Sequence, residues 1–332
     1  MLSGIPIAVL GSNSFAGASV VRRLLEDGAD VVGFNRSAEG SAIFLQYRWG
    51  EFSGTYRFVK ADINHNLDEI AEILNDFNPK VVVDFMGQGM VAESWRHPDQ
   101  WYTTNVLSKV RLHEILLKLN GLERYIRIST PEVYGNTNTP ISENWDFNPS
   151  TPYAVSHAAT DMSLRAYNQH YGFPVIFARF ANFYGPGQQL YRIVPRTIIN
   201  ALTGKKLFLH GGGAAVRAFI FSTDIADGVA RLISSGVPGR TYHFSPDEFY
   251  TIRDVVTAAA SHLNIDLDSF VEAAADRPSK DRAYLMDASL AKRELGWKAK
   301  IDLHAGIRKT ADWVQSNFDE IKTLPLDYVH RA

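Results

Sequence analysis

Short apolar runs alternate with helical stretches through the first half of the chain, and this alternation restricts the possible folds more than any other feature. The runs IPIAVLG (5–11), DVVGF (30–34) and KVVVDF (80–85) are separated by segments with apolar residues at helical spacing, such as 15–27 and 67–77. Strands that alternate with helices of this length are typical of a parallel sheet covered by helices on both faces. We therefore predict an α/β fold with a doubly wound parallel sheet.

A glycine-containing loop follows the first predicted strand. In VLGSNSFAG (9–17), Gly11 can make the tight turn and Gly17 lets the next helix pack closely on the sheet. Backbone N–H groups and the positive helix end can then hold a pyrophosphate. Ser14 stands where dinucleotide-binding loops usually have a third glycine, and serine fits there if its φ angle stays negative. The loop indicates a Rossmann-type dinucleotide-binding domain, although this spacing alone is weakly specific.

The chain changes character beyond about residue 183. Loops rich in glycine and proline, such as YGPGQ (184–188) and HGGGAA (210–215), separate shorter elements there. We predict two parts: a dinucleotide-binding domain over residues 1–182, joined by about 219–246, and a smaller substrate-binding lobe over 183–218 and 247–332.

The composition excludes several classes of protein. The 332 residues include no cysteine, which rules out disulfides and thiolate metal sites, and we predict no metal site. A net charge of −2 gives no electrostatic reason to expect nucleic acid or an anionic membrane as a partner. The chain has no run of about 18 apolar residues, and its opening reads as a strand rather than a signal peptide. We expect a cytoplasmic protein without a nucleic-acid or membrane partner.

The end of the second predicted strand bears on the choice of cofactor. An acidic residue there would bind the 2′-hydroxyl of the adenosine ribose, whereas an arginine would favour a 2′-phosphate. This chain has Asn35, Arg36 and Ser37 without an acid, so NADP is favoured over NAD. Asp62, followed by Ile63, stands at the next strand end, where a carboxylate can accept a hydrogen bond from the adenine amino group.

A second motif pairs a tyrosine with a histidine. In TPYAVSHAATD (151–161), Tyr153 and His157 lie four positions apart, on one face of a predicted helix. Such pairs are common on solvated helices, so the spacing alone does not indicate a site.

Longer segments are far more specific. They are WYTTNV (101–106), ISTPEVYG (128–135), NPSTPYAVS (148–156), ARFANFYGPGQ (178–188), LHGGGAAVRAFI (209–220) and DRAYLMDASLAKRELGW (281–297). With these segments the chain resembles the extended short-chain dehydrogenase/reductases, specifically the nucleotide-sugar dehydratase, epimerase and decarboxylase group. The resemblance extends from residue 9 to about residue 297.

The resemblance implies roles for the matching residues. Tyr153 would take a proton from a sugar hydroxyl as hydride passes from the sugar carbon to nicotinamide, and Thr130 would hydrogen-bond the same hydroxyl. Glu132 matches the base that removes the C5 proton in dehydratases. The implied catalytic residues are Thr130, Glu132, Tyr153 and His157. The implied substrate-binding residues are Gln88, Ser94, Thr130, Asn182, Arg192, Arg217 and Arg282. The residues implied to hold a tightly bound, recycled NADP or NAD are Gly11, Asn13, Ser14, Phe15, Ala16, Gly17, Asn35, Arg36, Ser37, Asp62, Ile63, Phe85, Met86, Gly87, Asn105, Ser129, Tyr153, His157 and Phe180.

Two departures from the family pattern concern the chemistry. The family has a lysine at position 157, and its dehydratases have an aspartic acid, which protonates the leaving C6 hydroxyl, where this chain has Pro131. We expect His157 to replace the lysine as an imidazolium, which would lower the pKa of Tyr153 and make activity narrowly pH-dependent. His157→Lys is then expected to raise activity on the alkaline side.

Three functions remain open at this point. We expect a nucleotide-sugar 4,6-dehydratase that recycles its cofactor. A decarboxylase of a nucleotide uronic acid, or an epimerase, is the alternative within enzymes, and Pro131 admits the decarboxylase. The non-enzymatic alternative is a catalytically impaired protein that binds a sugar nucleotide and the cofactor. We also expect a homodimer formed by two long helices over 101–119 and 150–171, through apolar positions that include Val106, Val110, Leu112 and Leu116.

Overall fold

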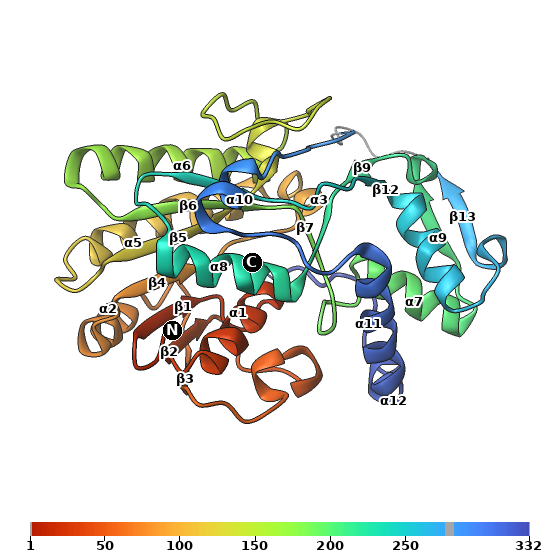
Figure 1. Ribbon diagram of the computed structural model, residues 1–332, viewed down its shortest axis with the longest axis horizontal. Helices are drawn as coiled ribbons and strands as arrows, with labels where there is room; N and C mark the ends of the chain where they lie inside the picture. The colour runs from red at the N-terminus through yellow and green to blue at the C-terminus, as the bar shows by residue number, and fades with distance from the viewer. Residues whose placement is uncertain (1, 276–281, 332) are drawn as a thin grey trace.

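A computed structural model describes residues 2–275 and 282–331. Its centre is a seven-stranded sheet in the order β11-β6-β5-β4-β1-β2-β3, and every pairing within it is parallel (Figure 1). The strands are β1 (Pro6–Leu10), β2 (Asp30–Asn35), β3 (Thr55–Lys60), β4 (Val81–Asp84), β5 (Arg124–Ser129), β6 (Val175–Phe180) and β11 (Thr241–Phe244).

Helices cover both faces of this sheet. The helices are α1 (Phe15–Glu26), α2 (Leu67–Phe77), α3 (Val91–Ser94), α4 (Pro98–Tyr102), α5 (Ser108–Leu116), α6 (Pro152–Tyr171), α7 (Ile193–Thr203), α8 (Ser222–Ser235), α9 (Ile252–His262), α10 (Ser289–Leu295), α11 (Leu303–Ser316) and α12 (Phe318–Ile321). Ile7 and Val9 of β1 pack in one core with α1 and α8, whereas Ala8 and Leu10 pack in a second core with α2 and α5. Successive side chains of a strand point to opposite faces, so both faces of β1 are buried. The predicted doubly wound α/β fold is confirmed.

The helix predicted over 101–119 is interrupted. Residues Thr103–Leu107 form one π-helical segment, η3, between α4 and α5. Asn105 lies in this segment, and its side chain donates to Gln88 O (3.2 Å) and to Ser156 Oγ (2.9 Å). Single π-turns inside helices often occur at functional sites. This turn brings a buried amide against the loop that follows β4.

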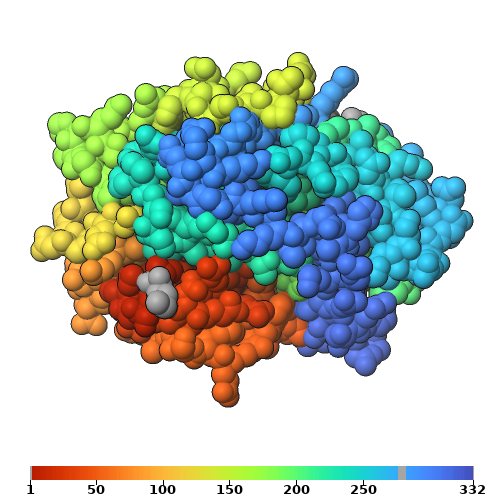
Figure 2. Space-filling model, viewed as in Figure 1, coloured from red at the N-terminus to blue at the C-terminus, as the bar shows by residue number. Residues whose placement is uncertain are grey.

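The smaller lobe is built from α7, α9, α11 and α12 with three short strand pairs. The pairs are β7 (Asn182–Tyr184) with β10 (Phe219–Phe221), β9 (Val216–Arg217) with β12 (Tyr250–Thr251), and β8 (Leu207–His210) with β13 (Val271–Ala274). Trp313 of α11 donates to Ile43 O (3.1 Å), and Figure 2 shows α11 and α12 lying against the N-terminal segment. The short 3₁₀ turns are η1 (Ala42–Phe44), η2 (Gln46–Arg48), η4 (Pro131–Tyr134), η5 (Gly211–Gly213) and η6 (Leu267–Ser269).

Two later segments lie with the large sheet. Strand β11 is an edge of that sheet, and α8 packs beside α1. Residues of α10 and Trp297 join the same core, although they fall within the range predicted for the smaller lobe. We therefore propose the same division of the chain, with residues 288–297 packed on the large sheet. In the described part of the chain, no helix is long and apolar enough to span a bilayer.

A group of charged side chains is buried between the sheet and α5 and α6. Asp84 of β4 is paired with Lys109 of α5, and both side chains are fully buried. Asp161 of α6 accepts from Arg127 Nε of β5 (3.3 Å) and from Arg179 Nη2 of β6 (2.8 Å). Because each carboxylate faces a cation, the charges are compensated where water is excluded.

The pKa values in this group follow from burial and from its surplus of positive charge. Burial alone would raise the pKa of Asp84, but the charges of Lys109 and Arg127 outweigh burial and leave it below its ordinary value. Burial also lowers the pKa of Lys109 to about 8, against the opposing attraction of Asp84. Two carboxylates and three cations leave the group net positive.

The buried histidines predict how stability depends on pH. Burial lowers the pKa of both His113 and His243 to about 3, and it lowers that of His157 well below the ordinary value. These side chains bind protons in the unfolded chain but not in the folded one as the pH falls below about 6.5. The stability that they contribute is therefore present above pH 6.5 and lost toward acid.

We expect the free energy of unfolding to fall between about pH 6.5 and pH 5, by up to about 1.4 kcal/mol per pH unit for each buried histidine. Urea unfolding at several pH values measures this. His243→Gln keeps a partner for the Tyr134 hydroxyl, which lies 2.8 Å from His243 Nε2, and should reduce the slope. The exposed His304 provides the control His304→Gln, which should leave the slope unchanged. Equal slopes in the parent and His243→Gln would contradict this explanation.

Candidate active site

The loop after β1 forms a cradle that only glycine permits. Gly11 has φ +81°, and a Cβ atom on Gly17 would lie 2.2 Å from Gly11 O. Ser14 caps α1 with φ −68°, so the predicted negative φ is confirmed. Its hydroxyl donates to Gly11 O (2.7 Å) and accepts from Gly17 N (3.1 Å). A tight glycine turn at the start of a helix that follows β1 fits the pyrophosphate of a dinucleotide.

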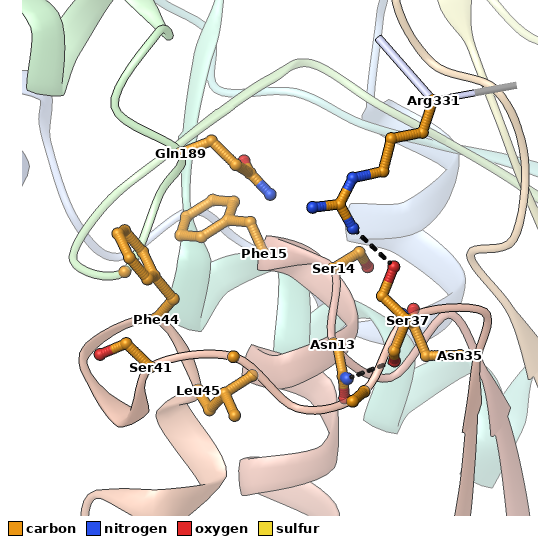
Figure 3. Close-up of a pocket in the computed structure, with 13 residues that line it drawn as sticks. Asn13, Ser14, Phe15, Asn35, Ser37, Ser41, Phe44, Leu45, Gln189 and Arg331 are labelled. Carbon is orange, nitrogen blue, oxygen red and sulfur yellow. Dashed lines mark hydrogen bonds between the residues drawn. The ribbon is translucent and has the colours of Figure 1, made fainter. Parts of the chain in front are cut away.

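Two cavities meet at this loop. One, of about 140 Å³, lies at the carboxyl ends of β1, β2 and β4. The other, of about 450 Å³, lies beside the start of α1 and is shown in Figure 3. The predicted cofactor residues that line the smaller cavity are Gly11, Ser14, Asn35, Arg36, Ser37, Asp62, Ile63, Phe85, Met86 and Gly87, together with the predicted substrate residue Gln88. Those that line the larger one are Asn13, Ser14, Phe15, Asn35 and Ser37.

Among the predicted residues that line neither cavity, four have side chains engaged elsewhere in the fold. Ala16 and Phe180 lie in the hydrophobic core, where Phe180 stacks on Phe244 at 4.5 Å between ring centroids. Ser129 donates its hydroxyl to Asp161 (2.6 Å), and Ser94 donates its own to Val91 O (2.7 Å). The hydroxyls of Ser129 and Ser94 therefore serve the fold.

Asn105 acts through the loop after β4. Its Oδ1 accepts from Gln88 N (2.8 Å), and a Cβ atom on Gly87 would lie 2.9 Å from the same oxygen. The asparagine thus positions Gly87 and Gln88 at the cavity while being buried itself.

The three central residues meet where β5 ends and α6 begins. Thr151 caps α6 by accepting from Ala154 N (3.1 Å), which places Tyr153 in the first turn. Thr130 Oγ1 accepts from Glu132 N (3.2 Å) at the end of β5. Burial raises the pKa of Tyr153, whereas the Thr130 side chain lowers it, so the threonine lies close to the phenol. Tyr153 also lies within the electrostatic influence of the Glu132 carboxylate. The predicted grouping of a tyrosine, a threonine and a glutamate is therefore present in the structure.

Comparison with known proteins identifies the family. Residues 9–310 match the model of the GDP-mannose 4,6 dehydratase family. A dTDP-glucose 4,6-dehydratase of Salmonella typhimurium is 30% identical over 338 residues, which cover 94% of this chain and 93% of the relative.

Solved structures agree with the sequence comparison. A dTDP-glucose 4,6-dehydratase of Streptomyces venezuelae with NAD bound has a TM-score of 0.86 and 28% identity, covering 95% of this chain and 98% of that chain. A dTDP-glucose 4,6-dehydratase of Bacillus anthracis in complex with NAD has a TM-score of 0.86 and 27% identity, covering 97% and 100%. This chain belongs to the nucleotide-sugar 4,6-dehydratase and epimerase family.

Within this family fold, a tyrosine links the predicted substrate residues. The Arg217 guanidinium lies over the ring of Tyr284 at 3.9 Å from its centroid. Burial raises the pKa of Tyr284, whereas the Arg217 and Asn182 side chains lower it, so both lie close to the phenol. The buried Arg217 donates to Arg282 O (2.8 Å). Sequence reasoning missed Tyr284, although it stands within the matching segment 281–297.

The other two arginines are exposed. Arg192 precedes α7 and lies over the ring of Tyr191 at 5.2 Å. Arg282 adjoins β9, where its carbonyl accepts from Val216 N (2.9 Å). Arg192 lowers the pKa of Tyr153 electrostatically, so its charge reaches the catalytic tyrosine. Among the described residues, no group of three or more metal-ligating side chains is placed to hold a metal ion.

His157 stands where the family has lysine, and its ring lies 4.6 Å from that of Tyr153 between centroids. Its Nδ1 lies 3.0 Å from Arg127 Nη2. A guanidinium can only donate, so Nδ1 is an acceptor and carries no proton, which leaves the proton on Nε2. Burial lowers the pKa of His157 well below its ordinary value, and Arg127, Lys109 and Arg179 lower it further.

The predicted imidazolium is therefore wrong. His157 is neutral because it is buried beside more cations than carboxylates. Protonation would add one more positive charge to this group. The cation in contact with the His157 ring is instead Arg127 of β5. The loss of activity expected on the alkaline side, as His157 gives up its proton, also falls away, since this ring stays neutral throughout the working pH range.

The same geometry reverses the expected effect of His157→Lys. A lysine there would place an ammonium against the Arg127 guanidinium in a buried site, which we expect to lower the free energy of unfolding by about 3 kcal/mol. Denaturant unfolding measures the change. The neutral variant His157→Gln, which retains a donor and an acceptor, serves as the control and should lose less.

A second variant removes the Arg127 guanidinium as well. Arg127→Gln combined with His157→Lys lets the new ammonium pair with Asp161, four residues along the helix, and should recover part of the lost stability. A His157→Lys protein as stable as the parent would contradict the assignment of a cation at Arg127.

Proposed function

We propose that this protein is a nucleotide-diphosphate-sugar 4,6-dehydratase that uses a bound, recycled NAD. The observation that carries the proposal is the placement of Thr130 and Glu132, which follow β5, beside Tyr153 in the first turn of α6. Relatives and neighbours with this fold are dTDP-glucose 4,6-dehydratases, and two of the solved ones hold NAD. Arg217, Arg192 and Arg282 supply the cations that a diphosphate requires.

Tyr153 and Thr130 act on the hydroxyl at C4 of the sugar. Burial raises the pKa of Tyr153, and Glu132 raises it further, whereas the Thr130 hydrogen bond and Arg192 lower it. The phenol is therefore protonated at rest and must release its proton before it can accept one from C4. The bound nicotinamide supplies the hydride acceptor and a positive charge that favours the phenolate. As the C4 hydride leaves, the phenolate takes the hydroxyl proton and Thr130 keeps the oxygen aligned.

Glu132 carries out the elimination. The carboxylate removes the proton at C5, which the C4 ketone acidifies, and the electron pair forms the C5–C6 double bond as the C6 hydroxyl leaves. The leaving hydroxyl needs a proton, and Pro131 can donate none. We propose that Glu132, protonated by the C5 step, delivers this proton to the departing oxygen, so that water leaves and the carboxylate is restored. Return of the hydride to C6 and of a proton from solvent to C5, while Tyr153 releases the proton that it took from the C4 hydroxyl, completes the 4-keto-6-deoxy sugar.

NAD replaces NADP as the proposed cofactor. The preference for NADP rested on Arg36 at the end of β2, and the neighbouring dehydratase structures contain NAD instead. In this structure Arg36 Nη2 donates to Arg331 O (3.2 Å), so the guanidinium is engaged by the end of the chain. The position of Arg36 therefore does not require a 2′-phosphate.

Pro131 favours one second candidate. Decarboxylation of a nucleotide uronic acid after C4 oxidation releases carbon dioxide and needs no proton donor for a leaving hydroxyl. The similar proteins with this fold are named as dehydratases, and this favours the dehydratase as the first candidate.

A panel of sugar nucleotides separates these functions. We expect the hexose substrate to lose water, with a product that develops the alkaline ultraviolet absorbance of 4-keto-6-deoxy sugars. Mass spectrometry of the products measures this. Loss of carbon dioxide from a uronic acid would establish the decarboxylase, and an isomer of unchanged mass would establish an epimerase.

Two variants separate the steps. Tyr153→Phe should slow hydride transfer by about 10²–10⁴-fold, because the proton acceptor is lost, while leaving sugar-nucleotide binding nearly intact. Glu132→Gln should still reduce the nicotinamide in the presence of substrate and then stop, since nothing removes the C5 proton. Absorbance of reduced nicotinamide after mixing measures both. Full turnover by Glu132→Gln would contradict the proposed role.

We also propose a homodimer, through a corrected set of residues. Leu112 and Leu116, expected at the interface, are buried in the core of this chain. The exposed apolar side chains of α4, η3 and α6 instead include Tyr102, Leu107, Val155 and Met162, of which Met162 is 60% exposed. Helices α4 and α6 pack side by side, so these positions form one apolar surface that a second copy of the chain can cover.

The dimer predicts a clear response to charge. Leu107→Glu combined with Met162→Glu should convert the dimer to a monomer, because two carboxylates would be buried at the contact. Light scattering at micromolar concentration gives the mass. Phe208→Glu, at an equally exposed apolar position in the smaller lobe, is the control and should leave the mass unchanged. A monomeric parent would contradict the proposal.

A further inference from the structure

The last described residues, 324–331, run from the smaller lobe to the cofactor cavities. Arg196 of α7 holds the start of this segment through Leu326 O and Asp327 Oδ1 (3.0 Å). Tyr328 packs edge-on against Tyr191 at 5.2 Å between ring centroids. These contacts tie the segment to the smaller lobe.

His330 ties the segment to the large domain. Its ring stacks on Trp101 at 5.5 Å and on His97 at 5.4 Å. Its Nε2 lies 2.6 Å from Gln100 Oε1. The segment therefore connects the two sides of the cavities with specific aromatic contacts rather than lying free on the surface.

Arg331 then bridges the mouth of the cofactor site. Its carbonyl oxygen accepts from Arg36 Nη2 (3.2 Å), after β2, and from Gln88 Nε2 (2.9 Å), after β4. Strand β1 lies between β2 and β4 in the sheet. The two hydrogen bonds to this carbonyl therefore come from both sides of the glycine loop that follows β1. A dinucleotide bound to a sheet of this kind crosses the carboxyl ends of the strands at the same place.

The side chain of Arg331 points into the larger cavity. Its Nη1 donates to Ser37 Oγ (3.0 Å), and Figure 3 shows the guanidinium between Gln189 and the start of α1, facing Ser14. The N-terminal end of α1, with its free backbone N–H groups, attracts negative charge. A guanidinium can donate two parallel hydrogen bonds to a phosphate. Arg331 is thus a cation placed at the phosphate loop by a segment far from it in sequence.

We propose that residues 324–331 form a latch that retains the dinucleotide, with Arg331 as a further contact to its diphosphate. This inference rests on the proposed function, in which the nicotinamide is reduced and reoxidised within one turnover and never needs to leave. The three hydrogen bonds of Arg331 are individually weak, so the latch can open to admit the cofactor. The contacts of Tyr328 and His330 keep the segment in place to close again.

Stopped-flow fluorescence of NADH binding tests the latch in three variants of the full protein. In a chain shortened after Asp327, we expect release of NADH to accelerate at least about tenfold, a change of about 1.4 kcal/mol in the barrier. Association should accelerate as well, because the entrance is permanently open. Arg331→Gln keeps the backbone bridge and should accelerate release by a smaller factor while leaving association unchanged.

The control is Arg22→Gln. Arg22 is an exposed arginine of α1, and its side chain is paired with Glu26 on the same helix. This variant should change neither rate. Faster association with unchanged release in the shortened chain would show that the segment only obstructs the site, and this would overturn the proposal. Unchanged rates would overturn it as well.

Circular dichroism and the unfolding temperature show whether the shortened chain keeps its fold. Arg331→Gln tests the latch without shortening the chain. Binding of NADH to the parent protein tests the proposed function, whereas the change in release on altering the segment tests the latch. If the parent protein binds NADH and converts its substrate, but the variants release NADH at the parent's rate, the latch is contradicted and the proposed function is not.

Discussion

The buried ion group between the sheet and α5 and α6 is the constraint on which the rest of the site depends. It connects β4, β5 and β6 with both helices through Asp84, Lys109, Arg127, Asp161 and Arg179. Removing either carboxylate would leave a cation unpaired in a region without water. The same group determines the state of His157, because its net positive charge and the hydrogen bond from Arg127 keep the ring neutral.

A neutral His157 divides the work of the family's lysine between two residues. Arg127, held by Asp161, provides the positive charge, and His157 presents a fixed Nε2–H on the side away from it. That N–H can hydrogen-bond the ribose of a bound nicotinamide, which needs a donor and not a charge. This cation contacts His157 and does not take the place of the lysine itself. The tyrosine therefore depends more on Thr130, Arg192 and the cofactor for ionisation.

The sequence allowed the fold and the centre of the site to be predicted because both depend on local patterns. Alternating strands and helices predict the sheet, and Gly11 and Gly17 have backbone conformations or contacts that exclude a side chain. The charge state of His157 could not be predicted, because Arg127 lies 30 residues earlier and meets it only when β5 packs under α6. A signal was present: arginines within strands that otherwise read as buried, RYIRIS and VIFARF, require buried carboxylates. Tyr284 and Arg331 reach the site through long-range packing and carry no such signal.

The most direct test of this account is the protonation of His157, measured by NMR of protein with ¹⁵N-labelled histidine. The signal is assigned by its loss in His157→Gln and is followed between about pH 5.5 and pH 9. We predict a single neutral tautomer, protonated on Nε2 and not on Nδ1, with no titration over this range. A His157 signal that titrates near its ordinary pKa of about 6.5 would contradict the account, because the cation beside Tyr153 would then be the histidine itself.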